Sequence, residues 1–413
     1  MKLGGLGVRA GVGALNSGGK VLQSVGFEPP ALERESLERA ARRRTRLNDL
    51  GDWPIDEPFS RLLESYRNEA HLSTLGRIAV RELLVSLFEQ LLHLEAERAR
   101  APAIANEVIE APVFVVGLPR TGTTLLHGLL SADPASRAPL SWEVMYPAAY
   151  PNDARGIARA RRQTAVRLGL ADRLVPEFMK IHAIAADLPQ ECIAISAQVF
   201  ASIQFHTTHN VPSYEDWFER EGQDLAYAYH RRVLQHLQAR GPAGRWVLKA
   251  PGHLFGLAAL LEQYPDSRII QTHRDPLRVL PSMASHATVL RRAFSDHVDP
   301  AEVAADWTAR WAGALENFLD VRNGAPAEHF LDVSYREIVA DPLATVERIY
   351  SFLGWQWNDE ARAAMAGFLA ANPKNKHGRH RYTLAQYGLD RETEVNRFRN
   401  YCERFDIAVQ ADG

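Results

Sequence analysis

A glycine-containing loop with a single arginine is the first feature of the sequence that could do chemistry. In VFVVGLPRTGTTLLHGLL (residues 113–130), an apolar run leads into Gly117, Arg120 and Gly122, and a helical pattern opens at Thr123. The backbone N–H groups of such a loop and of the following helix N-terminus together form an anion site. The two glycines match the nucleotide loop GxxxxGK[ST], but Thr123 replaces its lysine and the basic group comes earlier, at Arg120. An enzyme that cleaves nucleoside triphosphates would lack its phosphate-binding lysine here.

A second pair of polar residues follows a later apolar run, in THRDPLRVLPSMAS (residues 272–285). Arg274 stands at the end of that run, and Ser282 lies eight residues later in a helical pattern. An arginine at a strand end and a serine on the next helix can converge on one phosphate, because they supply a charged fork and a hydroxyl. A salt bridge at the strand end is the alternative reading of Arg274.

The sequence uses lysine sparingly, with six lysines against 42 arginines. A lysine inside an apolar strand therefore indicates a need for a compact ammonium group. Lys249 is such a residue, at the end of RWVLKA. Lys374 and Lys376 fall together in the basic loop NPKNKHGRHR.

Four short apolar runs must position these side chains. They cover residues 112–117, 245–250, 267–273 and 329–335, and helical patterns follow each of them. This alternation is typical of βαβ units, so we expect an α/β fold with a parallel β-sheet flanked by helices. The long region at about 140–244 reads as a helical insertion. Because strand C-termini converge on one edge of such a sheet, we expect this insertion to form the substrate pocket.

We divide the whole chain into three parts. Residues 1–30 are a flexible, glycine-rich N-terminus, and residues 31–110 form a helical segment with a turn at 48–58. Residues 111–413 form the α/β domain, which ends in an amphipathic helix near 390–405. Apolar residues in 72–92 recur at the three-to-four spacing of a helix with one broad buried face.

Composition excludes several classes of protein. The net charge of −2 argues against a nucleic-acid binder held by phosphate contacts. Cys192 and Cys402 lie far apart, which argues against a disulfide scaffold and fits a cytoplasmic protein. We find no secretory signal and no apolar run of the ~18–20 residues that a membrane span requires. These observations leave open a peripheral contact between the protein and a membrane surface.

The two polar motifs together resemble those of the PAPS-dependent sulfotransferase superfamily, in its bacterial branch. PAPS is 3′-phosphoadenosine 5′-phosphosulfate. The residues that match the 5′-phosphosulfate loop are Pro119, Arg120, Thr121, Gly122, Thr123 and Thr124. Arg274 and Ser282 are similar to the 3′-phosphate motif. The resemblance covers roughly residues 110–405, and implies a P-loop-like fold and PAPS as co-substrate, with no metal.

The resemblance also implies roles for residues near the reacting group. We assign Arg120 to the sulfonate and its bridging oxygen, and Lys249 to a further cation at the same edge. Two residues compete as general base: Glu143, which follows the loop at the interval of carboxylate-type sulfotransferases, and His253 in KAPGH, which departs from the KTH motif of the cytosolic enzymes. The interval favours Glu143. We expect Glu191 to face the acceptor.

A basic segment near the C-terminus completes the expected nucleotide site. Lys376, Gly378 and Arg379 resemble the family's C-terminal segment that closes over the 3′-phosphate, and a solvated loop is the alternative. Histidine pairs in HTTH (206–209) and HGRH (377–380) lack a convincing third ligand, so we expect no metal site.

We therefore predict an enzyme that moves sulfonate from PAPS to a hydroxyl of a small-molecule, lipid or glycan acceptor by in-line transfer. A P-loop kinase-like phosphotransferase is the first alternative, and a nucleotide-binding relative without activity is the second. The absence of the lysine of the GxxxxGK[ST] loop and the presence of the Arg274–Ser282 pair argue against the kinase. Fold and motifs do not identify the acceptor.

Overall fold

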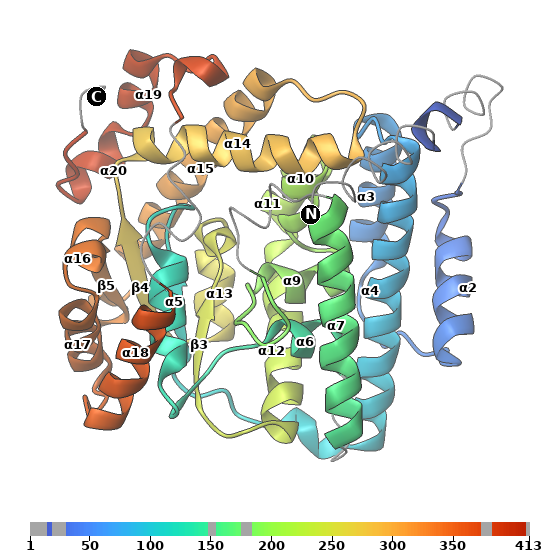
Figure 1. Cartoon of the computed structure of the whole chain (residues 1–413), viewed down its shortest axis with the longest axis horizontal. Helices are drawn as coiled ribbons and strands as arrows, with labels where there is room; N and C mark the ends of the chain where they lie inside the picture. The colour runs from blue at the N-terminus through green and yellow to red at the C-terminus, as the bar shows by residue number, and fades with distance from the viewer. Residues whose placement is uncertain (1–14, 19–29, 148–153, 175–183, 373–381, 410–413) are drawn as a thin grey trace.

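The structure of the chain is a computed structural model. It describes residues 15–18, 30–147, 154–174, 184–372 and 382–409. Within these ranges the chain folds into one five-stranded sheet surrounded by helices (Figure 1). The sheet order is β2-β3-β1-β4-β5, and every neighbouring pair is parallel. The predicted α/β fold with a parallel sheet is confirmed.

The four predicted strands are all present, and a short edge strand joins them. The strands are β1 (Val113–Val116), β2 (Ser136–Arg137), β3 (Arg245–Lys249), β4 (Arg268–His273) and β5 (Phe330–Ser334). The sequence analysis missed β2, because two residues carry no readable apolar run. All four residues of β1 are buried, as expected for a central strand that is covered on both faces.

Alternate residues of the strands pack into two separate hydrophobic clusters. Val113 and Val115 of β1 face one cluster, whereas Phe114 and Val116 face the other. The period of two in strand geometry produces this division. The smaller cluster is covered by α5 (Thr123–Ala132), α17 (Pro342–Leu353) and α18 (Asp359–Ala371).

The larger cluster lies between the sheet and the remaining helices. Its N-terminal members come from α2 (Arg34–Thr45), α3 (Asp56–Asn68) and α4 (Thr74–Arg100). The Ser73 side chain accepts a hydrogen bond from the Gly76 N–H and caps α4. Helix α3 begins inside the stretch predicted as a turn. The same cluster includes residues on both sides of position 110, so the proposed division there stays a prediction.

The region predicted as an insertion is helical, apart from the short strand β2 just before it. The α-helices within its described residues are α6 (Ser141–Met145), α7 (Ala154–Leu174), α9 (Ile193–Ser196), α10 (Gln204–Thr208), α11 (Pro212–Glu221) and α12 (Gln223–Arg240). After β3 come α13 (Leu257–Gln263), α14 (Pro276–Phe294) and α15 (Pro300–Gly324). Figure 1 shows α7 on the near side of the molecule and α14 across its top.

The C-terminal region contains three short helices in addition to α17 and α18. They are α16 (Tyr335–Ala340), α19 (Arg391–Arg397) and α20 (Arg399–Arg404). The amphipathic helix predicted near 390–405 is therefore broken into α19 and α20, which meet at Phe398. None of the described helices is both long enough and apolar enough to span a membrane.

Candidate active site

The loop between β1 and α5 has the backbone conformation of an anion cradle. Gly117 has φ 155°, Arg120 φ 67° and Gly122 φ 93°, so the chain turns sharply within a few residues. Gly122 is the N-cap of α5 and has no side chain to accept the first N–H groups of the helix. These donors, together with the positive end of the helix dipole, face the outside of the loop. The local sequence therefore builds a site for a negatively charged group.

Contacts with β4 hold this loop in place. The Thr121 hydroxyl donates to the Leu118 carbonyl at 2.6 Å and lies 2.7 Å from the Thr272 hydroxyl. A Cβ on Gly117 would lie 2.3 Å from the Thr272 Oγ1, so only glycine allows this approach. Thr272 was not among the predicted site residues. Its position in the sequence could have indicated a site residue, because Thr272 lies near the C-terminal end of an apolar strand and the C-terminal ends of parallel strands meet at one edge of the sheet.

Two arginines meet beside the loop. Arg274 Nη1 donates to the Arg120 carbonyl at 2.7 Å, and the Arg274 guanidinium lies 4.1 Å from the Tyr335 ring centroid. Burial lowers the pKa of Arg274, and the charge of Arg120 lowers it further, whereas Tyr335 acts in the opposite direction. Two neighbouring cations that repel each other are stabilised by an anion placed between them.

A groove opens next to Arg274, at the C-terminal ends of β4 and β5. It has a volume of about 640 Å³, and Arg274, Arg278, Tyr335 and Phe405 are among its lining residues. Its size is that of a typical small-ligand site. Tyr335 was not predicted as a site residue, although it follows an apolar strand run. The groove combines arginines and aromatic rings with four carboxylates, those of Asp275, Asp332, Glu337 and Asp406.

Lys249 reaches the loop from the end of β3. Its Nζ lies 3.4 Å from the Thr124 hydroxyl and forms an ion pair with Glu191. The Lys249 side chain is buried and that of Glu191 is nearly so. The structure therefore brings together a predicted cation, a predicted loop residue and the carboxylate that we expected near the acceptor.

His253 lies in a short 3-10 helix, η3 (Pro251–Leu254), just after β3. Its Nδ1 is 2.6 Å from the Tyr227 hydroxyl, and its Nε2 has no hydrogen-bond partner among the described residues. Burial lowers the pKa of His253 well below its usual range. The charge of Lys249 acts in the same direction and that of Glu191 opposes it. The imidazole is therefore neutral and close to the Lys249–Glu191 pair.

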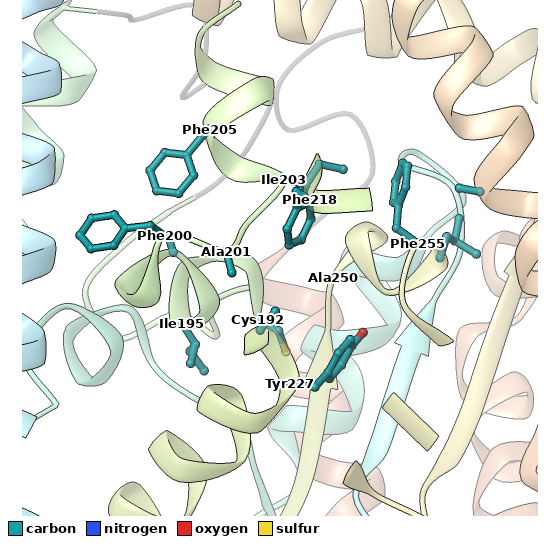
Figure 2. Packing of buried hydrophobic residues seen from close by; sticks show 14 of the residues in the cluster. Cys192, Ile195, Phe200, Ala201, Ile203, Phe205, Phe218, Tyr227, Ala250 and Phe255 are labelled. Atoms are coloured by element: carbon teal, nitrogen blue, oxygen red, sulfur yellow. The ribbon is translucent and has the colours of Figure 1, made fainter. Parts of the chain in front are cut away.

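A small cavity adjoins His253. It has a volume of about 30 Å³, enough for one or two water molecules. Figure 2 shows several of the surrounding side chains, with Cys192, Phe218 and Tyr227 from different elements gathered around Ala250 at the end of β3. The lining residues include Cys192, Ile203, Phe218, Tyr227, His230 and His253. The cavity is mostly apolar, with one imidazole nitrogen of each histidine unpartnered among the described residues.

Glu143 has a different environment. As the third residue of α6, it accepts a hydrogen bond from the Leu140 N–H at 2.8 Å and lies 3.4 Å from Arg137 Nη2. The Arg137 guanidinium stacks 4.6 Å from the Trp246 ring. Trp246 precedes Lys249 by three residues of β3, about 10 Å along the strand. These contacts cap a helix and bury an ion pair, and neither involves the anion loop.

The remaining predicted residues occupy three kinds of position. Ser282 is half-buried in the second turn of α14, the helix that follows Arg274, and Pro119 and Thr123 belong to the loop and the start of α5. Lys376, Gly378 and Arg379 lie outside the described residues. Within the described ranges, His, Cys, Asp and Glu side chains form no group of three or more that could hold a metal ion.

Comparison with known proteins decides the family. A family model described as "Sulfotransferase family" matches residues 112–359, which include the loop, Lys249, His253 and Arg274. The crystal structure of sulfotransferase STF1 from Mycobacterium tuberculosis is 34% identical, covers 89% of this chain and 98% of its own, and superimposes with a TM-score of 0.79. The chain belongs to the sulfotransferase family. The similarity that the sequence motifs indicated is thereby confirmed.

Two further relatives support the assignment to the bacterial branch of this sulfotransferase superfamily. The crystal structure of sulfotransferase STF9 from Mycobacterium avium is 25% identical, with a TM-score of 0.80, and covers 94% of this chain and all of its own. Omega-hydroxy-beta-dihydromenaquinone-9 sulfotransferase Stf3 from Mycobacterium bovis is 25% identical over 391 residues, 86% of this chain and 97% of the relative. The similarity to these sulfotransferases therefore extends over nearly the whole chain.

Proposed function

We propose that this sulfotransferase uses PAPS as donor and transfers its sulfonate in line to a hydroxyl group of a small-molecule or lipid acceptor. The observation that carries the proposal is the pair of repelling arginines, Arg120 and Arg274, beside a loop with free helix N-terminal donors. Such a site suits an anion that presents negative charge both to the loop and to Arg274. A nucleotide with phosphate groups at both its 5′ and 3′ positions meets this requirement.

The residues present fit PAPS at several points. The loop N–H groups suit the 5′-phosphosulfate, and the Arg274 guanidinium, with Ser282 on the next helix, suits the 3′-phosphate. The groove beside Tyr335 is large enough for the nucleoside. The proposed nucleotide-binding residues are Pro119, Arg120, Thr121, Gly122, Thr123, Thr124, Arg274 and Ser282, and from the sequence motif also Lys376, Gly378 and Arg379. When bound, PAPS supplies an activated sulfonate.

The residues of this chain then have three tasks. Arg120 and Lys249 place positive charge where negative charge develops on the leaving phosphate. The small, mostly apolar cavity beside His253 receives the acceptor hydroxyl in place of water. A general base takes the proton of that hydroxyl, and we propose His253 Nε2 for this role in preference to Glu143. His253 is neutral and lies within electrostatic range of Lys249, whereas Glu143 forms an ion pair with Arg137.

Tyr227 and Glu191 support this arrangement. For Nε2 to accept a proton, Nδ1 must carry the other one and donate it to the Tyr227 oxygen, 2.6 Å away. Glu191 forms an ion pair with Lys249 and opposes the fall in the pKa of His253. The Stf3 relative acts on a hydroxylated menaquinone according to its name. A hydrophobic alcohol is accordingly the acceptor class that we propose, in a cytoplasmic enzyme.

Thermal unfolding with added nucleotides tests the donor. Adenosine 3′,5′-bisphosphate should raise Tm much more than AMP or ATP with Mg²⁺, since it alone offers the 3′-phosphate to Arg274. A ligand that binds the native state at 100 times its Kd stabilises it by about 2.7 kcal/mol. Arg274→Ala should remove the preference for the bisphosphate over AMP. Equal shifts with AMP and the bisphosphate would refute PAPS as donor, and a larger shift with ATP and Mg²⁺ would favour a kinase.

A further inference from the structure

Helix α7 presents an outward face that the proposed reaction does not use. Ala160 and Thr164 are buried and mark the side of the helix that faces the protein. At 3.6 residues per turn, the opposite side carries Arg155, Arg159, Arg162, Val166, Gly169, Leu170 and Arg173. Figure 1 shows α7 on the near side of the molecule. The side chains that face solvent here are four arginines and two aliphatic residues.

Two other arginines attach α7 to the protein. Arg161 forms an ion pair with Asp187 at 2.8 Å, and Arg167 donates to the Ser86 hydroxyl at 2.8 Å. The inner side of α7 thus has its own polar partners. By contrast, Arg159, Arg162 and Arg173 form no ion pair with another described residue. The charges of these three arginines are therefore left for something outside the described part of the fold.

Nearby acidic groups do not cancel this charge. Glu82 and Glu89 of α4, the helix that α7 contacts through Arg167, are already paired with Arg44. Asp172 is the single acidic residue of α7, and it lies at the edge of the outward face. The outward face itself has four positive charges and no negative one.

Two aliphatic side chains in this face indicate what it contacts. Val166 is 68% exposed and Leu170 57% exposed, and at a spacing of four they lie side by side on the helix. A nucleic acid would bind the arginines and leave these two side chains in water, because its phosphate backbone offers no apolar surface. The boundary between lipid headgroups and acyl chains accepts both, because arginine binds lipid phosphate while aliphatic groups insert beneath it.

We propose that the outward face of α7 docks the enzyme on the surface of a bilayer rich in anionic phospholipids. Positive side chains attract such a surface, and the Val166–Leu170 pair inserts at its boundary. The proposal does not depend on PAPS or on the acceptor, since it concerns adsorption of the folded chain. Its failure would leave the proposed reaction untouched.

Vesicle cosedimentation of the full chain, without nucleotide, tests the proposal. The native protein should pellet with vesicles of equal parts phosphatidylcholine and phosphatidylglycerol, and should stay in solution with pure phosphatidylcholine. Each arginine contributes about fivefold to partitioning, so Arg159→Gln/Arg162→Gln/Arg173→Gln should reduce it about 100-fold. Val166→Ser/Leu170→Ser should reduce it about tenfold, and this loss should persist in high salt.

A matched control removes three exposed arginines elsewhere. Arg39→Gln/Arg43→Gln/Arg67→Gln makes the same change of charge on α2 and α3 and should bind vesicles like the native chain. Should the α7 triple variant not fold, Arg162→Gln alone should still show the fivefold loss. Equal loss in the control, equal binding to both vesicle types, or no binding by the native protein would overturn the proposal. Binding of single-stranded RNA that needs the three arginines but not Val166 and Leu170 would also overturn it.

Discussion

At the scale of single residues, Arg120 has an unusual backbone. Its φ of 67° lies in the left-handed region, which costs a residue with a side chain about 1 kcal/mol. The Arg274 guanidinium binds its carbonyl and holds that conformation. The exposed Arg120 side chain is thereby presented at the mouth of the loop. Strain of this kind is typical of functional positions.

Substitution of Arg120 tests its role in catalysis. Arg120→Ala should lower kcat by about 10²–10³-fold, the usual effect of removing one preorganised donor to the transition state. Affinity for adenosine 3′,5′-bisphosphate should fall less, because the loop backbone still binds the phosphate. Steady-state kinetics and calorimetry separate the two effects. Arg67→Ala on α3 serves as the control, and near-normal kcat in Arg120→Ala would exclude the proposed role.

The two candidate bases differ in what surrounds them. His253 lies within electrostatic range of Lys249 and Glu191, and its Nε2 has no partner among the described residues, whereas Glu143 accepts bonds from Leu140 and Arg137. The sequence interval from the loop had favoured Glu143. In the fold, that interval brings Glu143 to the cap of α6.

Paired substitutions distinguish the bases. His253→Asn should lower kcat by about 10²–10⁴-fold, the usual contribution of general base catalysis. Glu143→Gln should leave kcat within a few-fold and instead lower the free energy of unfolding by about 1–3 kcal/mol, because the buried Arg137 loses its charged partner. Steady-state rates with an accepted substrate measure kcat, and urea unfolding measures the free energy of unfolding. The opposite ranking of the two kcat values would make Glu143 the base.

At the scale of elements, α11 buries a carboxyl group without hydrogen bonds. Glu215 is fully buried, and neither of its oxygens has a partner among the described residues. Burial raises the pKa of Glu215 well above its usual value, Glu219 adds to this, and Arg310 opposes it. The folded chain therefore keeps this carboxyl protonated, whereas the unfolded chain ionises it near pH 4.5. Stability is lost as the pH rises above that value.

Glu215→Gln should therefore stabilise the protein at neutral pH. Each pH unit between the unfolded and folded pKa costs about 1.4 kcal/mol, so we expect a gain of about 1–3 kcal/mol near pH 7. The gain should disappear toward about pH 4, where both states of the native protein are protonated. Urea unfolding at several pH values measures it. A gain in stability that does not depend on pH would contradict the explanation.

At the scale of the whole molecule, several buried histidines link stability to pH. His127, His209 and His230 are buried, and burial lowers the pKa of each from 6.5 to about 3. Folding keeps them neutral, whereas the unfolded chain protonates them below pH 6.5. Stability from this source is present above pH 6.5 and is lost as the pH falls toward 3.

The free energy of unfolding should accordingly decrease on mild acidification. Each histidine contributes about 1.4 kcal/mol per pH unit, so these three together contribute about 4 kcal/mol per unit between about pH 6 and 5. Glu215 offsets about one third of this. His206, His236 and His253, whose pKa values burial also lowers, add to this slope. Urea titrations across this range measure the slope. His209→Gln should reduce the number of protons taken up on unfolding by one, which lowers the slope by about 1.4 kcal/mol per pH unit. A flat profile would show that these histidines are not buried as described.

The sequence alone determined the strands and the anion loop. The apolar runs at β1, β3, β4 and β5 are long enough to be recognised as strands. The spacing of the loop glycines is a local pattern, so it can be recognised without knowledge of the fold. Family membership also followed from these local motifs. Arg274 is found in the sequence for the same reason, since it ends an apolar strand.

Tertiary structure decided which distant groups meet. Glu191 and Lys249 are 58 positions apart, and Tyr227 lies 26 positions before His253, so no local pattern could pair them. The choice between Glu143 and His253 depends on the same kind of information. The number of residues between a side chain and the loop gives their separation in sequence, but not their distance in the fold. Only packing of the insertion against β3 sets which carboxylate and which imidazole stand beside Lys249, because those contacts form between elements that are far apart in the chain.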